Sequence, residues 1–299
     1  MNSMYTLDMI TSLHADKLNV LGGMIPLDGR VSWAPKESTG FQPSNCYLLT
    51  EPSGSDRLLI DSGLAIHSEL IIGDLIERIG EGGGISIFFT RAEMDCVSNL
   101  EALAARFDVQ RLFTGGVINP FDAFSDLSGA ALRGRRHQVD RQRTEDGDAL
   151  TRAAEIEVAP GRVLQIESPL LRLLPTFWGW DAATGALFTS DTFTHGVADR
   201  PDGPRVLDSA GTDETTPEQV AAHLYAKYEW LPRSNCEPLR EWLYEKFTAL
   251  QPEIIAPSRG QVIKGRALVN SHLEMMLAAL RPGAALEAPV PNLAQKENA

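Results

Sequence analysis

Apolar residues occur in short β-type runs through the first half of the chain and in helical stripes nearer its end. Residues 85–90 form an apolar, β-rich run that predicts a buried strand, and a helical pattern starts directly behind it at Val97. Residues 67–76 also predict a helix, so strands and helices alternate as they do when helices cover sheets. Over residues 216–250 the apolar positions recur at helical spacing, and Thr216-Pro217 suits a helix start. The pattern favours an α/β fold.

Length and composition indicate a single domain. The chain has 299 residues, of which 43% are hydrophobic, and it can bury one substantial core. We expect one domain over residues 1–285, followed by a flexible tail over residues 286–299. Residues 130–160 are charged and predict hairpins, with Asp146-Gly147 as a turn signal. The apolar stripes within residues 216–250 are expected to form core or the surface of a homodimer.

The net charge and the spacing of the cysteines indicate which cellular compartment and which classes of partner to expect. A formal net charge of -13 repels nucleic acid and anionic membranes, so neither is expected as a partner. The sequence has no run of about 18 apolar residues and no basic N-terminal region followed by an apolar one, which predicts a soluble, cytoplasmic protein. Cys46, Cys96 and Cys236 are widely spaced and provide neither a disulfide framework nor a Cys-x-x-Cys site, which fits a reducing compartment.

The turn between the predicted buried strand and the helix behind it carries the candidate chemistry. It reads Thr-Arg-Ala-Glu-Met-Asp-Cys over residues 90–96. This turn resembles that of the metallo-β-lactamase superfamily, which reads Thr-His-x-His-x-Asp-His, and more closely that of its flavodiiron branch, which reads His-x-Glu-x-Asp-His. Glu93 and Asp95 match the flavodiiron version, whereas Arg91 and Cys96 stand where it has histidines.

The resemblance covers roughly residues 40–265, in the family's order. Further matching segments are an opening hairpin, an Asp-x-Gly turn, a strand that ends in a metal-bridging aspartate, and a turn that supplies the last histidine: residues 45–49, 58–63, 185–193 and 256–260. The aspartate is Asp191, Arg259 replaces the last histidine, and Leu173 stands near the position of another. The resemblance implies an αββα sandwich of two mixed sheets flanked by helices, of the flavodiiron and oxygen-binding di-iron protein type.

The resemblance also implies which positions hold the metals in a di-iron relative. One metal would use positions 91, 93, 173 and 191, and the other would use positions 95, 96, 191 and 259. In this chain the carboxylates Glu93, Asp95 and Asp191 are kept and the histidines are lost. Arginine cannot ligate a cation because its guanidinium stays protonated, and each guanidinium would repel an ion by roughly 4 kcal/mol per charge at about 4 Å. We therefore expect no bound cofactor, with Arg91 and Arg259 neutralising the carboxylates instead.

We therefore predict that the protein binds or senses a small molecule at a degenerate metal site. An anion is one possible ligand. Three residues are candidates for ligand binding: Arg91, Arg259 and Trp178. The alternative is a hydrolase or an oxygen- or nitric-oxide-reactive metalloenzyme, in which the three carboxylates hold one or two ions of iron, manganese or zinc. A vestigial site on a scaffold kept for binding or assembly is also open.

Four residues are candidates for catalysis: Asp95, Cys96, Asp191 and His195. Cys96 is expected at a helix start beside an arginine, so it is either a thiolate of lowered pKa or a small buried residue that fills the space of a histidine. His195 is either a general base, a substitute metal ligand or a solvated loop residue. Trp178 either walls the pocket or packs in the core.

Overall fold

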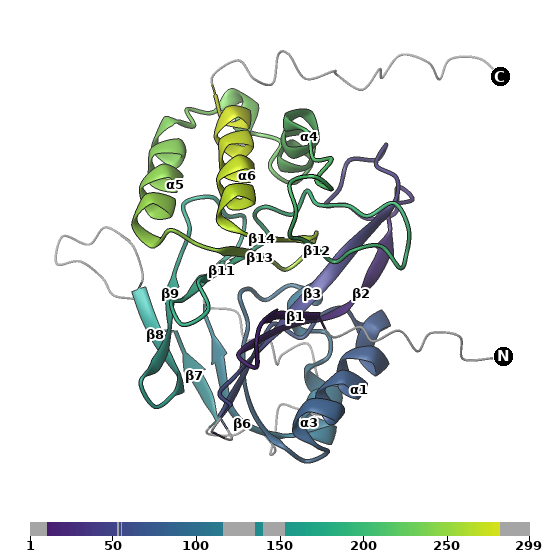
Figure 1. The fold of residues 1–299 in the computed structure, drawn as a ribbon, viewed down its shortest axis with the longest axis vertical. Helices are drawn as coiled ribbons and strands as arrows, with labels where there is room; N and C mark the ends of the chain where they lie inside the picture. Colours follow the sequence, from purple (N-terminus) through teal and green to yellow (C-terminus); the bar gives the residue numbers. More distant parts are fainter. Residues whose placement is uncertain (1–10, 53, 55, 116–134, 140–152, 282–299) are drawn as a thin grey trace.

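The protein is described by a computed structural model, which defines residues 11–52, 54, 56–115, 135–139 and 153–281. Within these residues, two seven-stranded sheets pack face to face and helices cover their outer faces. Figure 1 shows the order of the layers, with α1 and α3 on one side and α4, α5 and α6 on the other. The predicted αββα sandwich of two mixed sheets is therefore confirmed.

The first sheet contains the strands of the first half of the chain in sequence order. Its strands are β1 (Thr11–His14), β2 (Leu18–Pro26), β3 (Phe41–Thr50), β4 (Arg57–Ile60), β5 (Gly84–Phe88), β6 (Asp108–Thr114) and β7 (Arg136–Gln138). Strands β1 to β4 pair antiparallel, and β4 to β7 pair parallel. Parallel neighbours need crossover connections, which here contain η1 (Ala65–His67), α1 (Ser68–Ile79), α2 (Met94–Val97) and α3 (Leu100–Arg106).

The second sheet has the order β12-β14-β13-β11-β10-β9-β8. Its strands are β8 (Ala153–Ala159), β9 (Arg162–Glu167), β10 (Trp178–Asp181), β11 (Ala186–Ser190), β12 (Val206–Leu207), β13 (Ile254–Pro257) and β14 (Val262–Lys264). Strands β11 and β13 are parallel neighbours. The connection between them passes through α4 (Pro217–Lys227), η3 (Leu231–Arg233) and α5 (Glu237–Leu250), and α6 (Arg266–Ala279) follows β14.

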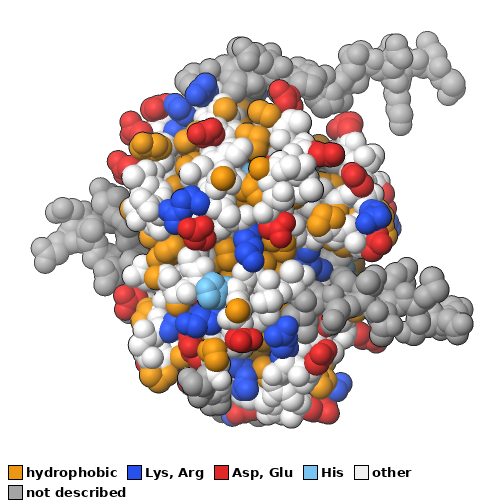
Figure 2. Space-filling model, in the orientation of Figure 1, with side chains coloured by type: hydrophobic (Ala, Val, Ile, Leu, Met, Phe, Trp, Pro, Cys, Tyr) orange, Lys and Arg blue, Asp and Glu red, His pale blue; other side chains and the backbone are white. Residues whose placement is uncertain are grey.

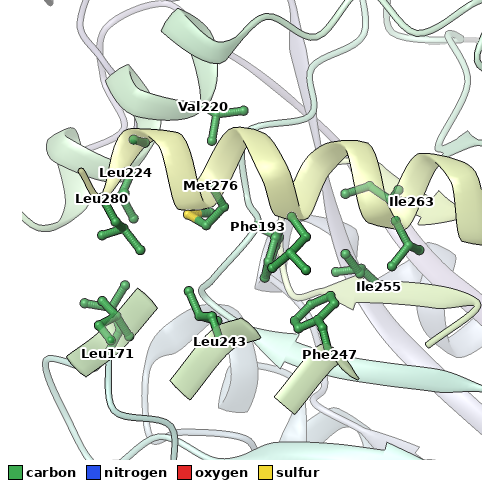
Figure 3. Packing of buried hydrophobic residues seen from close by; sticks show 14 of the residues in the cluster. Leu171, Phe193, Val220, Leu224, Leu243, Phe247, Ile255, Ile263, Met276 and Leu280 are labelled. Atoms are coloured by element: carbon green, nitrogen blue, oxygen red, sulfur yellow. The ribbon is translucent and has the colours of Figure 1, made fainter. Parts of the chain in front are cut away.

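The core consists of three groups of buried apolar side chains. One group lies between the sheets and includes Tyr47, Phe88 and Phe188. A second group lies beneath α1 and α3. The third lies beneath α4, α5 and α6, and Figure 3 shows Phe247 and Met276 among its members. Each layer of the sandwich thus buries its own apolar face, which is the main source of its stability.

Most of the predicted elements are present with shifts of a few residues at their ends. The strand expected at 85–90 is β5, and the helix expected at 67–76 is α1. The helical segment 216–250 contains α4 and α5, and the Thr216 hydroxyl accepts a hydrogen bond from the Gln219 N–H as an N-cap. The turn at Asp146-Gly147 and the tail at 286–299 lie outside the described residues.

Two further observations bear on partners. Within the described part of the chain, no helix has the length and apolarity needed to cross a membrane. Figure 2 shows acidic and basic side chains interspersed over the face in view. The net charge of -13 is thus not gathered into a single acidic field on this face.

Candidate functional site

The candidate site lies where the turns that follow β4, β5, β11 and β13 meet. Strands β4 and β5 are parallel neighbours in the first sheet, as β11 and β13 are in the second. Hydrogen bonds join the two sheets at this edge. The N–H of Asn45 donates to the carbonyl of Ser258 at 2.8 Å, and the N–H of Phe177 donates to the carbonyl of Thr90 at 2.9 Å. Turns that are distant in the sequence are therefore held together.

Arg91 lies at the centre of the site, and its side chain is 0% exposed. Its Nε donates to Oε2 of Glu93 at 2.5 Å, and its Nη2 forms an ion pair with Oδ2 of Asp95. Its Nη1 donates to the hydroxyls of Ser190 at 2.7 Å and Ser258 at 3.1 Å. The guanidinium therefore binds side chains from three different turns, in the fork geometry that suits arginine.

Arg259 approaches the same carboxylate from the second sheet. Its Nη1 donates to Oδ2 of Asp95 at 2.8 Å. Its guanidinium also lies over the ring of Trp33, with 4.5 Å from Cζ to the ring centroid. Such a cation–π contact stabilises a desolvated guanidinium. Asp95 thus accepts from both arginines, as the sequence predicts.

Lys227 is a third cation at the site. Its Nζ lies 3.2 Å from Oδ2 of Asp191 and 3.6 Å from Oε2 of Glu93. The hydroxyl of Tyr228 donates to Oδ1 of Asp191 at 3.2 Å. Sequence reasoning missed Lys227, although its spacing held a signal. It lies seven residues after Val220 on the buried stripe of α4, where a charged residue needs a partner.

These contacts define the ion-pair cluster: Arg91, Glu93, Asp95, Asp191, Lys227 and Arg259. It holds three cations and three carboxylates, so its formal charge is zero. Burial alone would raise the pKa of Asp95, but Arg259 and Arg91 outweigh burial and hold that pKa below its usual value. Burial likewise opposes ionisation of Asp191, and Arg91 and Lys227 lower its pKa. Asp95 and Asp191 are ionised because the cations surround them.

A hydrogen-bonded chain connects the cluster to β4. The carboxylate of Asp61 accepts the N–H and the hydroxyl of Thr90, each at 2.8 Å. The Thr90 hydroxyl lies 2.8 Å from the hydroxyl of Ser190, which accepts from Arg91. Burial raises the pKa of Asp61 to about 6. This network ties the turns of both sheets to the buried guanidinium.

The backbone at these turns adopts an uncommon conformation. Asp61, Ser190 and Phe193 have φ angles of 59°, 54° and 63°. A positive φ costs energy for residues other than glycine and persists only where the surroundings enforce it. Of the five non-glycine residues with positive φ in the described chain, these three lie beside the cluster. Three turns of uncommon backbone conformation therefore adjoin the cluster.

Cys96 does not have the lowered thiol pKa that one alternative of the prediction gave it. Its side chain is fully buried among apolar residues of the first sheet and α3. Burial raises the pKa of its thiol well above the usual value, despite the neighbouring Arg91. The expected lowering of this pKa is therefore wrong, because desolvation outweighs the nearby charge. The alternative reading, a small buried residue, agrees with the structure.

His195 is buried rather than solvated. Its Nε2 lies 2.8 Å from Nδ1 of His272, and the two rings stack with centroids 5.1 Å apart. Nε2 of His272 lies 3.0 Å from Oδ2 of Asp213. Burial lowers the pKa of His195 well below its usual value. The solvated-loop alternative is wrong, and the ring nitrogen engaged by His272 is not directed at a metal.

Two other predicted positions lie away from the cluster. The side chain of Leu173 is 47% exposed, so it does not stand in for a buried ligand. Trp178 is 1% exposed and packs against Trp242, with ring centroids 5.1 Å apart. The expectation that Trp178 contacts a ligand at this site is corrected, because its ring belongs to the core beneath α5.

The donor set does not fit a di-metal centre. Arg91 and Arg259 stand where the resemblance places histidines, and both already bind Asp95. A guanidinium offers donors only and has no lone pair for a metal. Among the described residues, no group of three or more His, Cys, Asp and Glu side chains is arranged to hold a metal ion.

Solved structures share this architecture. Rubredoxin oxygen:oxidoreductase from Desulfovibrio gigas superposes with a TM-score of 0.65 at 14% sequence identity, and the match covers 90% of this chain and 60% of that one. The chain has the metallo-β-lactamase-like fold of the flavodiiron proteins. A variant of the flavo di-iron protein from Thermotoga maritima gives a TM-score of 0.64 at 17% identity, with the same coverage of both chains.

This flavodiiron-type fold is also matched over a shorter protein. The peroxy di-iron species of the chemotaxis sensor ODP superposes with a TM-score of 0.56 at 16% identity, covering 93% of this chain and 98% of that one. The chain thus spans about 60% of the length of the two flavodiiron structures and nearly all of the sensor. At these identities the likeness establishes the fold. No protein-family profile and no curated protein matches the sequence.

Proposed function

We propose that this protein is a metal-independent binding protein on the flavodiiron-type fold, in which the ion-pair cluster replaces a di-metal centre. The observation that carries the proposal is the buried guanidinium of Arg91, which binds Glu93 and Asp95 at once. The carboxylates that would ligate metals are thereby occupied by side chains of the same protein. The electrostatic role of the metals passes to guanidinium and ammonium groups.

Electrostatics support this replacement. Two unit charges about 4 Å apart interact by about 4 kcal/mol at an effective dielectric constant near 20. A divalent ion beside Asp95 would meet four such repulsive pairs, because Arg91 and Arg259 both contact that carboxylate. Each cation of the cluster would also have to lose a carboxylate partner. The neutral cluster is therefore favoured over a bound metal ion.

The same charge balance bears on the ligand. Each of the three cations already has a carboxylate partner, so an anion would have to displace one of them. A neutral ligand meets no such cost, and we infer that the ligand is a small neutral molecule. The chemotaxis sensor ODP has about the length of this chain, which supports a sensing role over turnover.

Metal content is the first test. The full chain is produced with added iron, manganese and zinc, and metals are measured by plasma mass spectrometry. We expect less than about 0.1 equivalent of any metal, since no open ligand set recruits one. One or two equivalents that survive gel filtration would overturn the proposal.

A gain-of-metal variant tests the assignment of positions. Arg91→His, Cys96→His and Arg259→His together restore three of the four histidines that the resemblance implies around the retained carboxylates. We expect this triple variant to bind iron or zinc, because imidazoles replace two cations and a buried thiol. A matched control carries Arg30→His and Arg106→His, two exposed arginines, and should bind no more metal than the native protein. Equal metal uptake by the native protein and the triple variant would contradict the assignment.

A second candidate function is hydrolase-type catalysis. One observation favours it: His195 is hydrogen-bonded to a second histidine that is oriented by Asp213, which is an arrangement that can orient a general base. Substrate profiling separates the two functions. Turnover that disappears in Asp191→Ala supports an enzyme, whereas ligand-induced stabilisation without turnover supports a binding protein.

A further inference from the structure

A small cavity adjoins the ion-pair cluster between the loop after β11 and the helices α4 and α6. Its volume is about 10 Å³, which is room for about one water-sized molecule. Asp191 and Lys227 line the end of the cavity that belongs to the cluster. Its apolar wall includes Phe193, Val220 and Met276, and Figure 3 shows these three side chains converging from the loop, α4 and α6.

Two histidines, His195 and His223, are among the polar residues that line the cavity. His223 is 4% exposed, and its Nδ1 has no hydrogen-bond partner among the residues that the structure describes. A buried polar atom without a partner costs about 1–3 kcal/mol, so it points to a molecule that is bound beside it in the native protein. The cavity that His223 lines is the place for that molecule.

The hydrogen-bonded chain from Asp213 fixes the protonation pattern of His195. A carboxylate can only accept, so Nε2 of His272 carries the proton in its contact with Asp213. Because burial lowers the pKa of His272, that ring is neutral and its Nδ1 is an acceptor. His195 must then donate from Nε2, at 2.8 Å. A neutral His195 is left with a bare Nδ1, which is a hydrogen-bond acceptor.

We propose that this cavity binds one neutral, water-sized hydrogen-bond donor, and that Nδ1 of His195 receives its hydrogen bond. The inference rests on the proposed binding function and names the class of ligand: a neutral molecule close to water in size, such as methanol. A charged ligand is disfavoured because the histidines are neutral and the cluster has no net charge. Asp213 and His272 act as positioning residues, since they set the tautomer without lining the cavity.

The direct test is the tautomer of His195 in the native full chain. Long-range proton–nitrogen NMR on protein with ¹⁵N-labelled histidine distinguishes a bare Nδ1 from a protonated one, and His195→Gln assigns the signal. We expect a proton on Nε2 and none on Nδ1. A protonated Nδ1 would overturn the proposal, and this measurement requires no variant beyond the one used for assignment.

Methanol is the probe for binding. We expect its addition to shift the Nδ1 signal of His195 with saturation, and a Kd in the range of about 10–100 mM, because two non-hydrogen atoms can contribute little affinity. His223→Leu, which removes the unpaired Nδ1 of that side chain, should weaken this Kd several-fold. A shift that is linear in methanol and equal in both proteins would overturn the proposal.

Asp213→Asn tests the positioning chain. Oδ1 of Asp213 already accepts the N–H of Thr215, so the new amide nitrogen would face His272 and donate to it. The protons along the chain then reverse, Nδ1 of His195 becomes protonated, and the saturable methanol shift is lost, much as an Asp→Asn change gives the wrong tautomer in serine proteases. Asp208→Asn, at an exposed aspartate, is the control and should change neither signal. An unchanged tautomer in Asp213→Asn would contradict the role given to that residue.

The two proposals fail separately. Metal bound to the native protein, together with a bare Nδ1 and saturable methanol binding, would overturn metal independence and leave the cavity site standing. Metal-free protein in which Nδ1 of His195 is protonated would overturn the cavity site and leave metal independence standing.

Discussion

Replacing Arg91 by methionine tests whether the ion-pair cluster is a buried structural element. Methionine keeps an unbranched side chain of similar reach but removes the charge and every donor. The cluster would change from a formal charge of zero to one excess negative charge. Asp95 would keep Arg259, at 2.8 Å, while Glu93 would keep only the more distant Lys227, at 3.6 Å.

The expected loss of stability follows from burial. Asp95 is 3% exposed and Arg91 is 0% exposed, so water cannot replace the lost partner. Removing one partner of a buried ion pair typically costs 3–5 kcal/mol, and we expect about 4 kcal/mol for Arg91→Met. For a chain of this size, each kcal/mol lowers the melting temperature by roughly 2 °C, so the variant should melt about 8 °C lower.

Urea denaturation followed by tryptophan fluorescence measures the free energy of unfolding. Arg106→Met is the matched control, because Arg106 pairs with Glu81 at 2.9 Å where the two side chains are 44% and 64% exposed. Such a surface pair contributes at most about 1 kcal/mol. Adding Glu93→Gln to Arg91→Met should recover part of the loss, since Glu93 is the carboxylate left with only the distant Lys227. A loss in Arg91→Met no greater than in the control would refute the buried-cluster reasoning.

Three further predictions use the same preparation. Burial lowers the pKa of His223 from 6.5 to about 4, so the folded state resists its protonation and the free energy of unfolding falls as pH drops from 6.5 through 4. The shift corresponds to about 3 kcal/mol, with an opposite contribution from Asp61 over part of this range. His223→Gln should flatten the dependence of stability on pH, and an unchanged dependence would show that the burial argument is wrong. Lys227→Met should cost about 1–3 kcal/mol, less than Arg91→Met, because Lys227 is 11% exposed and Asp191 keeps Tyr228; an equal loss in the urea titration would contradict this ranking. Cys96 is fully buried, so iodoacetamide should modify it only in concentrated urea, and mass spectrometry that finds it alkylated in the native protein would show otherwise.

The fold was predictable because its signals are local and repeated. The apolar run at β5, the capped start of α4 at Thr216 and the order of the family-like turns each define an element without long-range information. Periodicity of apolar residues then separates strands from helices. The pairing partners of the second sheet could not be read in this way, because β11 joins β13 across a long helical excursion.

The site was predictable in its charges but not in its surroundings. Carboxylates and arginines at turn positions indicated the pairs of Asp95 with Arg91 and Arg259. The depth of burial was not visible in the sequence, and it reverses the expected pKa of Cys96. His195 contacts His272 of α6, and no local sequence pattern predicts a contact between residues so far apart in the chain.

The ion-pair cluster alters how the fold depends on its chemical surroundings. A bound ion stabilises a protein by an amount that grows with the free ion concentration and vanishes when the ion is removed. Guanidinium groups are carried by the chain itself, so every folded molecule holds them at the same effective concentration. The contribution of Arg91 and Arg259 to stability is therefore the same in metal-rich and metal-starved surroundings, and no chelator can extract it.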